Sequence, residues 1–277
     1  MSAAPSLSPD QRLERLDAIL RAGGPAAVAF SGGLDSTFLL HAARKALGDG
    51  LLAVTLETPY TPEGEVREAR AAARGMGVRH LVLKTPVPED IRDNPPERCY
   101  LCKRRLFGLV VRTAAREGLR RVLDGTNRDD LGDHRPGLRA VRELNVESPL
   151  LAAGLGKEDL RELARAQGLA VWDRPAGACL LTRLPHGVRV EEAQLRRIDQ
   201  AEDFLREVGF PAVRVRCHGD AARIEVPRER VGELLEAEAR HGVDARLKAL
   251  GFAHVCVDLA GYRTGSLNKN AAQAEKA

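Results

Sequence analysis

Residues 26–37 read Ala-Ala-Val-Ala-Phe-Ser-Gly-Gly-Leu-Asp-Ser-Thr, an apolar run followed at once by a small polar loop. The apolar part, 26–30, is typical of a strand that is buried in a parallel sheet. The loop 31–37 would then lie at the carboxyl end of that strand, where open α/β sheets bind their ligands. The stretch therefore predicts a binding loop between a buried strand and a helix.

The loop has the composition of a phosphate site. Gly32 and Gly33 allow the backbone to turn so that successive N–H groups face one concave site. The following helix presents its N-terminus, which favours an anion. Asp35 supplies a carboxylate for Mg²⁺ against the phosphates. Hydroxyl donors complete the set at Ser31, Ser36 and Thr37.

Two common nucleotide motifs are absent. The loop lacks the lysine of the G-x-x-x-x-G-K-[ST] motif, and the chain contains no G-x-G-x-x-G. The loop is therefore neither a Walker loop nor a dinucleotide fingerprint.

Strands alternate with helices around this loop, which predicts an α/β fold with a mostly parallel sheet covered by helices on both faces. Periodicity and end signals predict strands at 26–30, 51–56, 80–83, 121–124 and 170–172, and helices at 9–23, 37–47, 62–75, 103–117 and 157–167.

The pattern changes after Pro185, where two short segments of alternating character are framed by amphipathic helices. We expect a first domain over 1–185 and a small α+β domain with a partly exposed sheet over 186–277, frayed after residue 269. The second domain is predicted to contain helices at 191–208 and 229–241 and strands at 213–217, 222–226 and 253–259.

Composition places limits on location and partners. The 277 residues are 44% hydrophobic and 30% charged, with a formal net charge of +4. No apolar run approaches the ~20 residues that span a bilayer, and the N-terminus lacks the pattern of a secretory signal. We therefore expect a cytoplasmic protein with no membrane partner, and the mild charge argues against nucleic acid.

Three of the five cysteines, Cys99, Cys102 and Cys179, suggest metal or redox chemistry, because cytoplasmic thiols stay reduced. A zinc site would need a fourth ligand such as His186. Cys99 and Cys102, just before a predicted helix, suit a redox pair with Cys179 as acceptor. Three cysteines also suit a [4Fe–4S] cluster with one open iron. Cys217 and Cys256 are expected to be buried as small hydrophobic residues.

Three segments together resemble the ATP pyrophosphatase superfamily, which includes NAD synthetases, asparagine synthetases and tRNA thiolases. These segments are SGGLDS at 31–36, DGTNRDD at 124–130, and SPL at 148–150 leading to GLGK at 154–157. The resemblance implies cleavage of ATP between its α and β phosphates. It also implies that the nucleotide phosphates and the metal are served by Gly125, Asn127, Asp130 and Lys157, together with the loop at Ser31.

Longer segments resemble the LarE-type sulfur transferases, from about residue 12 to 268. They are RCYLCK at 98–103, GACLLTRLPHG at 177–187, VRVRCHGDAARIEV at 213–226 and GFAHVCVDLAGYRTGSLN at 251–268. The resemblance implies adenylation of a carboxylate of pyridinium-3,5-biscarboxylic acid mononucleotide and its conversion to a thiocarboxylate, for the nickel-pincer cofactor of lactate racemase. One branch sacrifices a single cysteine; the other has three and carries a [4Fe–4S] cluster, as the three here imply.

The same resemblance implies a small-molecule mononucleotide substrate, a separate sulfide donor and a ring-shaped homo-oligomer. It assigns the substrate phosphate to Arg183, Arg214 and Arg216, the last two on one face of a predicted strand. Two other functions remain open from the residues. One is a tRNA thiolase, which needs a basic RNA-binding surface, and the other is a non-enzymatic nucleotide- or zinc-binding scaffold.

Overall fold

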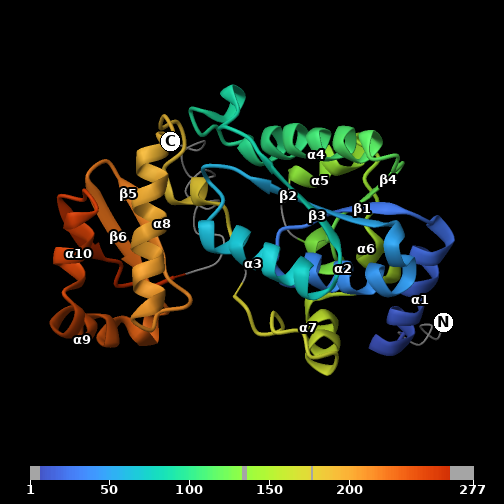
Figure 1. Cartoon of the computed structure of the whole chain (residues 1–277). Helices are drawn as coiled ribbons and strands as arrows, with labels where there is room; N and C mark the ends of the chain where they lie inside the picture. Colours follow the sequence, from blue (N-terminus) through green and yellow to red (C-terminus); the bar gives the residue numbers. More distant parts are fainter. Residues whose placement is uncertain (1–6, 133–135, 176, 263–277) are drawn as a thin grey trace, which may run out of the picture. The chain divides into compact units, whose positions relative to one another are not determined.

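The computed structural model describes residues 7–132, 136–175 and 177–262, which form two compact units (Figure 1). The first unit takes in the described parts of Met1–Thr58, Gly64–Pro88 and Glu97–Ala176. The second is built from Pro59–Glu63, Glu89–Pro96 and the described part of Gly177–Ala277. The second unit thus begins its long continuous segment at Gly177, whereas the sequence pattern changes near Pro185.

The first unit contains a parallel four-stranded sheet in the order β3-β2-β1-β4. Its strands are β1 (Ala26–Ala29), β2 (Leu51–Glu57), β3 (Arg79–Lys84) and β4 (Arg121–Leu123). Because parallel neighbours need crossover connections, each return passes through a helix. β1 lies between β2 and β4, so its carboxyl end opens at the middle of the sheet.

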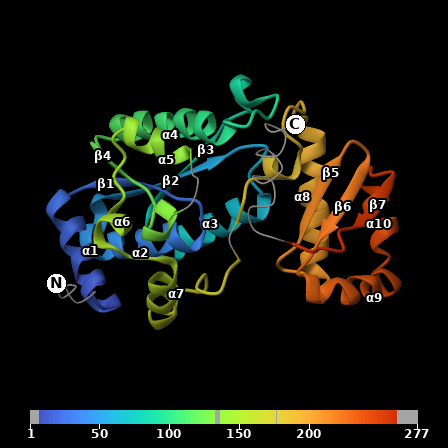
Figure 2. The ribbon, with the colours of Figure 1, turned by 180° about the vertical axis from the view of Figure 1, so that it is seen from behind.

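Helices cover both faces of this sheet (Figures 1 and 2). On one face lie α1 (Pro9–Gly23), α2 (Leu34–Leu47), α3 (Glu63–Gly75) and α7 (Lys157–Ala166), and on the other lie α4 (Arg98–Arg116) and α5 (Gly137–Glu143). The short β1 supplies both cores because successive side chains of a strand point to opposite faces. Ala26 and Val28 join the first core, and Ala27 joins the second.

Local signals explain where the helices begin. In α1, the hydroxyl of Ser8 accepts the N–H of Gln11 and the Gln11 side chain accepts the N–H of Ser8, a reciprocal capping box. The short α6 (Pro149–Ala153) has a proline at its first position and ends at Gly154 with φ +80°. Such caps fix the entry and exit of the chain without tertiary contacts.

The second unit contains a three-stranded mixed sheet in the order β5-β6-β7. β5 (Arg214–His218) pairs antiparallel with β6 (Ala221–Glu225), and β7 (His254–Val257) adds in parallel to β6. Three helices accompany it: α8 (Glu192–Glu207), α9 (Val231–His241) and α10 (Val243–Ala249). Both α8 and α10 pack against the sheet.

A buried asparagine ties one of the inserted segments to the rest of the second unit. Asn94, 0% exposed and with φ 48°, donates through its side-chain amide to the carbonyls of Leu181, Leu184 and Pro185. Its own carbonyl accepts the N–H of Gly187. The segment 89–96 therefore forms part of the fold of the second unit.

Three details of the sequence-based prediction are wrong. The strand expected at 170–172 is a series of turns, in which the N–H of Trp172 bonds to Leu169 and the carbonyl of Trp172 accepts from Arg161. Cys99 and Cys102 lie inside the first turns of α4 rather than before it, because the helix already begins at Arg98. Cys256 is exposed, since it lies on the outer side of β7.

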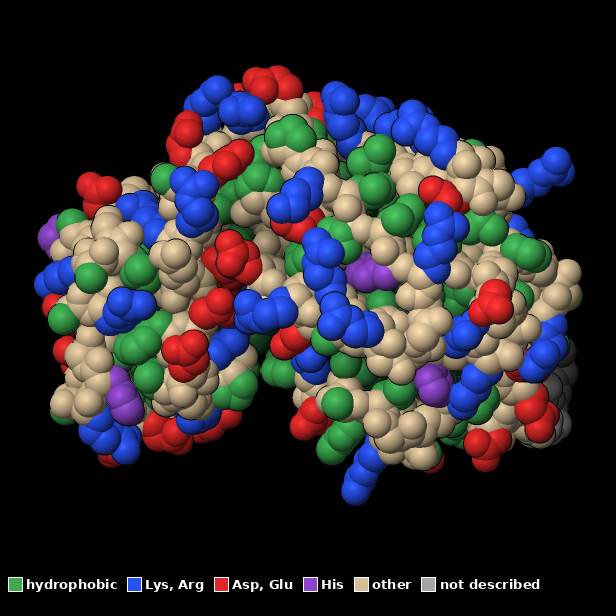
Figure 3. Space-filling view, in the orientation of Figure 1, with side chains coloured by type: hydrophobic (Ala, Val, Ile, Leu, Met, Phe, Trp, Pro, Cys, Tyr) green, Lys and Arg blue, Asp and Glu red, His purple; other side chains and the backbone are tan. Residues whose placement is uncertain are grey.

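The surface carries charges of both signs. On the face shown in Figure 3, basic and acidic side chains lie interspersed with hydrophobic ones. Among the described residues, no helix combines the length and the apolar character that a membrane span requires.

Candidate active site

The glycine loop after β1 is held in a narrow space. Gly32 has φ +81°, a conformation that favours glycine, and a Cβ atom on it would lie 3.1 Å from the Cβ of Ala69 in α3. The hydroxyls of Ser31 and Ser36 are 3.0 Å apart, and the Ser36 hydroxyl also lies 3.3 Å from the carbonyl of Gly33. The loop is therefore closed on itself by its own serines.

The helix that follows the loop offers polar groups to a ligand. α2 has Gly33 at its N-cap position, and no side chain caps it. The Oγ1 of Thr37 is buried and has no hydrogen-bond partner among the described residues. A buried hydroxyl without a partner is costly, so a ligand that supplies one is favoured. An anion at this helix N-terminus satisfies both the hydroxyl and the helix dipole.

The second predicted segment packs directly on the first. A Cβ atom on Gly125, just after β4, would lie 3.0 Å from the backbone nitrogen of Ser36, so only glycine fits without a backbone shift. Asp124 stabilises the turn by accepting from the hydroxyls of Thr126 and Ser148, each at 2.6 Å. The side-chain nitrogen Nδ2 of Asn127 is buried with no partner among the described residues.

The third segment joins the second. The backbone N–H of Lys157 donates to the carboxylate of Asp129 at 2.7 Å, which places the start of α7 beside the loop at 124–130. Gly156 allows this approach because a Cβ atom there would lie 2.8 Å from the same carboxylate. Asp130 is buried and accepts the N–H of Asn127. The structure thus brings together the three predicted ATP segments within the first unit.

Sequence reasoning missed one residue of this site, Arg174. Its guanidinium donates to the carbonyl of Gly32 at 3.1 Å and pairs with the carboxylate of Glu68 in α3 at 2.7 Å. The only local signal is a basic residue before Pro175, which is too common to indicate a role.

Cys179 and the three predicted phosphate-binding arginines belong to the second unit. Cys179 is half-buried and precedes a short 3₁₀ turn, Leu180–Arg183. The guanidinium of Arg183 lies 3.4 Å from the Cys179 carbonyl, and that of Arg216 donates to the Thr182 carbonyl at 2.6 Å. Arg214, also buried, stacks its guanidinium over the Tyr262 ring at 5.1 Å. The structure thus places Arg183 against Cys179 and Arg216 against the neighbouring turn, while Arg214 contacts Tyr262.

Two buried carboxylates organise the arginines. Glu202, 0% exposed, accepts both arms of Arg183 at 2.7 and 2.9 Å and also pairs with Arg206. Glu225 pairs with Arg216 at 2.9 Å and with Arg223 at 3.1 Å. The partly exposed Arg206 and Arg223 also pair with Asp203 and Asp258.

The close packing of these charged groups affects their ionisation. Burial opposes the charge on Arg183, but the hydrogen bonds and the charge of Glu202 outweigh it and raise the pKa of Arg183. The pKa of Arg214 is lowered, first by burial and then by repulsion from Arg183. This cluster has the character of an anion site, because an added phosphate relieves the repulsion.

Cys99 and Cys102 belong to the first unit, where Cys99 is exposed and Cys102 half-buried on the first turns of α4. Within the described ranges, no group of three His, Cys, Asp or Glu side chains is arranged to hold a metal ion.

Comparison with known proteins agrees with the geometry of the first unit. The sequence profile of the asparagine synthase family matches residues 14–131, which include the glycine loop and the loop after β4. A shorter similarity links the chain to a component of the glutamine-hydrolysing GMP synthase of Archaeoglobus fulgidus, 27% identical over 158 residues, which cover 53% of this chain and 52% of that protein.

Two relatives match nearly the whole chain. An uncharacterised Synechocystis protein is 34% identical over 262 residues, covering 94% of this chain and 98% of the relative. The pyridinium-3,5-bisthiocarboxylic acid mononucleotide synthase of Lactiplantibacillus plantarum is 37% identical over 253 residues, covering 90% and 91%. Because this similarity spans both units, the chain belongs to the LarE family, that of the pyridinium-3,5-bisthiocarboxylic acid mononucleotide synthases.

Proposed function

We propose that the protein is an ATP-dependent sulfur transferase that converts a carboxylate of a pyridinium mononucleotide into a thiocarboxylate, a step in making a nickel-pincer cofactor. The observation that carries the proposal is the loop before α2, where a helix N-terminus without a side-chain cap meets the buried, unpartnered Oγ1 of Thr37. The similarity to the Lactiplantibacillus pyridinium-3,5-bisthiocarboxylic acid mononucleotide synthase supports the choice of substrate.

In the first half of the reaction, the substrate carboxylate attacks the α-phosphorus of ATP, so that an acyl-adenylate forms and pyrophosphate leaves. Backbone N–H groups of the loop at Ser31–Ser36 and the hydroxyl of Thr37 bind the departing phosphates. Carboxylates of Asp35 and Asp130 have the donor chemistry that Mg²⁺ prefers, and the ion would neutralise charge on those phosphates. Lys157, Gly125 and Asn127 complete the nucleotide contacts.

In the second half, a sulfur nucleophile displaces AMP from the adenylate. Cys179 is the candidate sulfur site of the second unit, and Arg183, Arg214 and Arg216 bind the substrate phosphate beside it. The support for this assignment is that Arg183 lies against the backbone carbonyl of Cys179, that Arg216 donates to the carbonyl of Thr182, and that repulsion from Arg183 lowers the pKa of the buried Arg214 after burial itself. We expect the substrate to be a free small molecule, the replacement sulfide to come from a separate donor, and the enzyme to be a homo-oligomer.

The first experiment follows pyrophosphate and the mass of the protein in one reaction with ATP, Mg²⁺ and the dicarboxylate mononucleotide. We expect pyrophosphate and AMP to form with the substrate and neither without it. A loss of ~34 Da at Cys179, the mass of H₂S, would identify this thiol as the sulfur source. If no pyrophosphate forms with the mononucleotide, the proposed function is wrong.

The [4Fe–4S] cluster implied by three cysteines stays a prediction, and no step above depends on it. Protein purified without oxygen is expected to contain iron and to show broad Fe–S absorbance, both lost in Cys99→Ala and Cys179→Ala. Cys217→Ala is the matched control, because this buried thiol lies in β5. Repeated turnover by iron-free protein, with the Cys179 thiol intact, would rule out the cluster.

A further inference from the structure

The orientation of the peptide between Gly32 and Gly33 decides where the loop presents an N–H group. A trans peptide is planar, so the carbonyl of Gly32 and the N–H of Gly33 point in opposite directions. The Gly33 N–H points toward the hydroxyl of Ser31, at 3.4 Å. Whatever holds the Gly32 carbonyl in place therefore also fixes the direction of the Gly33 N–H.

Arg174 holds that carbonyl. Its guanidinium donates to it at 3.1 Å and is itself fixed by the Glu68 carboxylate at 2.7 Å. Glu68 precedes Ala69, the residue of α3 against which Gly32 packs. The two glycines have no side chains that could resist rotation of the peptide, so the arginine supplies a restraint that the loop lacks.

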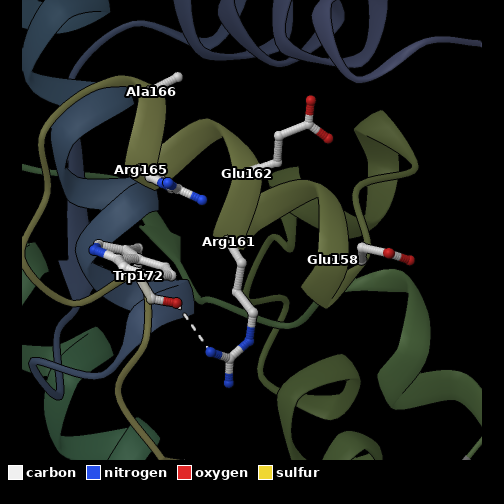
Figure 4. A pocket seen from close by; sticks show the side chains of 6 residues that line it. All are labelled: Glu158, Arg161, Glu162, Arg165, Ala166 and Trp172. Carbon is white, nitrogen blue, oxygen red and sulfur yellow. Dashed lines mark hydrogen bonds between the residues drawn. The ribbon is translucent and has the colours of Figure 1, made fainter.

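The segment that carries Arg174 is anchored in turn. Arg161 in α7 donates to the carbonyl of Trp172 at 2.9 Å and to that of Arg174 at 3.4 Å. Figure 4 shows the first of these contacts at the edge of an open groove along α7, with Arg165 on the other side of Trp172. These contacts fix the backbone on both sides of Asp173, and they belong to the same unit as the loop.

We infer that Arg174 is a positioning residue for the pyrophosphate group of ATP, acting through the Gly32–Gly33 peptide. The inference rests on the proposed function, because it takes the loop as the phosphate site. Arg174 itself contacts the loop at the Gly32 carbonyl, and its effect reaches the phosphates through the Gly33 N–H. An N–H bond to a charged phosphate is strong enough that losing it weakens binding by about tenfold.

The test measures the dissociation constant of magnesium pyrophosphate by calorimetry, which needs no turnover. Arg174→Ala is expected to weaken binding by about tenfold. Arg174→Lys is expected to restore part of it, because one nitrogen, Nη1, makes both contacts of Arg174 and a lysine ammonium can also donate to the Gly32 carbonyl, but from a more flexible side chain. Arg165→Ala is the matched control, since Arg165 stacks over Trp172 at 5.1 Å without contacting the loop. Circular dichroism and thermal unfolding establish that each variant is folded.

The outcomes separate this inference from the function on which it rests. If the unchanged protein fails to bind pyrophosphate, the loop assignment is wrong and the inference is wrong with it. If the unchanged protein binds and a folded Arg174→Ala variant binds equally well, only the positioning role is overturned. Equal weakening by Arg174→Ala and Arg165→Ala would also overturn it, because the effect would then be a general one on this segment.

Discussion

At the residue scale, the carboxylates of the two units are expected to have different roles. Asp35 lies in the first turn of α2 and Asp130 is buried beside Asn127, while Glu202 is enclosed by arginines in the second unit. Their distribution separates the proposed ion binding in the first unit from charge compensation in the second.

We expect Asp35→Ala to reduce pyrophosphate release by roughly two orders of magnitude, the scale of losing one electrostatic contact to the developing charge. Release is measured by a coupled phosphate assay at saturating substrate. Asp49→Ala is the control, since Asp49 is fully exposed beyond the other end of α2 and pairs only with Arg44 among the contacts described. Release at the rate of the unchanged enzyme in a folded Asp35→Ala protein would contradict the role of this carboxylate.

Glu202→Gln is expected to destabilise the protein by about 3–5 kcal/mol, because it leaves Arg183 buried without its full counter-charge. Urea unfolding at pH 7.5, followed by circular dichroism, measures the change in free energy of unfolding. The exposed pair Arg230–Glu233 provides the control, in which Glu233→Gln should leave the midpoint unchanged. A midpoint for Glu202→Gln equal to that of the unchanged protein would show that the pair is not needed for stability.

At the scale of elements, the spacing of apolar residues was sufficient to predict the position of an element wherever that element buries one face. The ends of β2, α1, α7 and α8 fall within one residue of their predicted positions, because apolar spacing and capping residues act locally. Residues 170–172 mislead because a short apolar run before a proline suits a turn as well as a strand. The short α5, α6 and α10 were missed, since two turns of helix carry little periodic signal.

In the candidate site, too, features that depend on local sequence could be predicted and features that depend on distant contacts could not. That the three segments of the predicted ATP site come together could be predicted, because each joins a strand end or helix start that the sequence marks. Arg174 could not, because its partners Gly32 and Glu68 are more than a hundred residues away in the chain. The three arginines near Cys179 were assigned to the substrate phosphate only from family resemblance, and the partner Glu202 depends on how α8 packs on β5.

The contact between the end of β4 and the start of α2 yields a prediction at this scale. Gly125→Ala places a methyl group 3.0 Å from the Ser36 nitrogen, so the two elements must move apart by a few tenths of an ångström. Because geometry at a reacting centre is sensitive to such shifts, we expect the Kd of ATP to rise by about tenfold. Gly132→Ala is the control, since nothing lies near its Cβ position. Equal affinity in both variants would mean that this close approach is unimportant for binding.

For the molecule as a whole, stability should depend on pH through Asp199 in α8. Burial raises the pKa of Asp199 to about 6, against the opposing effect of the N–H of Glu63, which donates to its carboxylate at 3.0 Å. In the unfolded chain the pKa is about 3.9. Folding therefore takes up a proton between these values, and the stability associated with the neutral acid is lost as the pH rises through about 6.

Asp199→Asn keeps an oxygen for the Glu63 N–H and removes the charge. We expect the variant to be more stable than the unchanged protein by about 1–2 kcal/mol at pH 8, with the shift discounted for solvent screening, and the difference to vanish toward pH 4. Urea unfolding across this range measures it. A constant difference from pH 4 to pH 8 would mean that Asp199 does not carry this dependence.

The second unit collects its chain from three stretches, two of which are inserted within the first unit. During synthesis, residues 59–63 and 89–96 leave the ribosome well before the segment that surrounds Asn94 exists. During synthesis these two segments therefore remain without their partners, and accessible to chaperones and proteases, until the last third of the protein has been made. A single proteolytic cleavage therefore cannot separate the two units completely. In a gene fusion, a truncation or an exchange between relatives, residues 59–63 and 89–96 must be moved together with the C-terminal part.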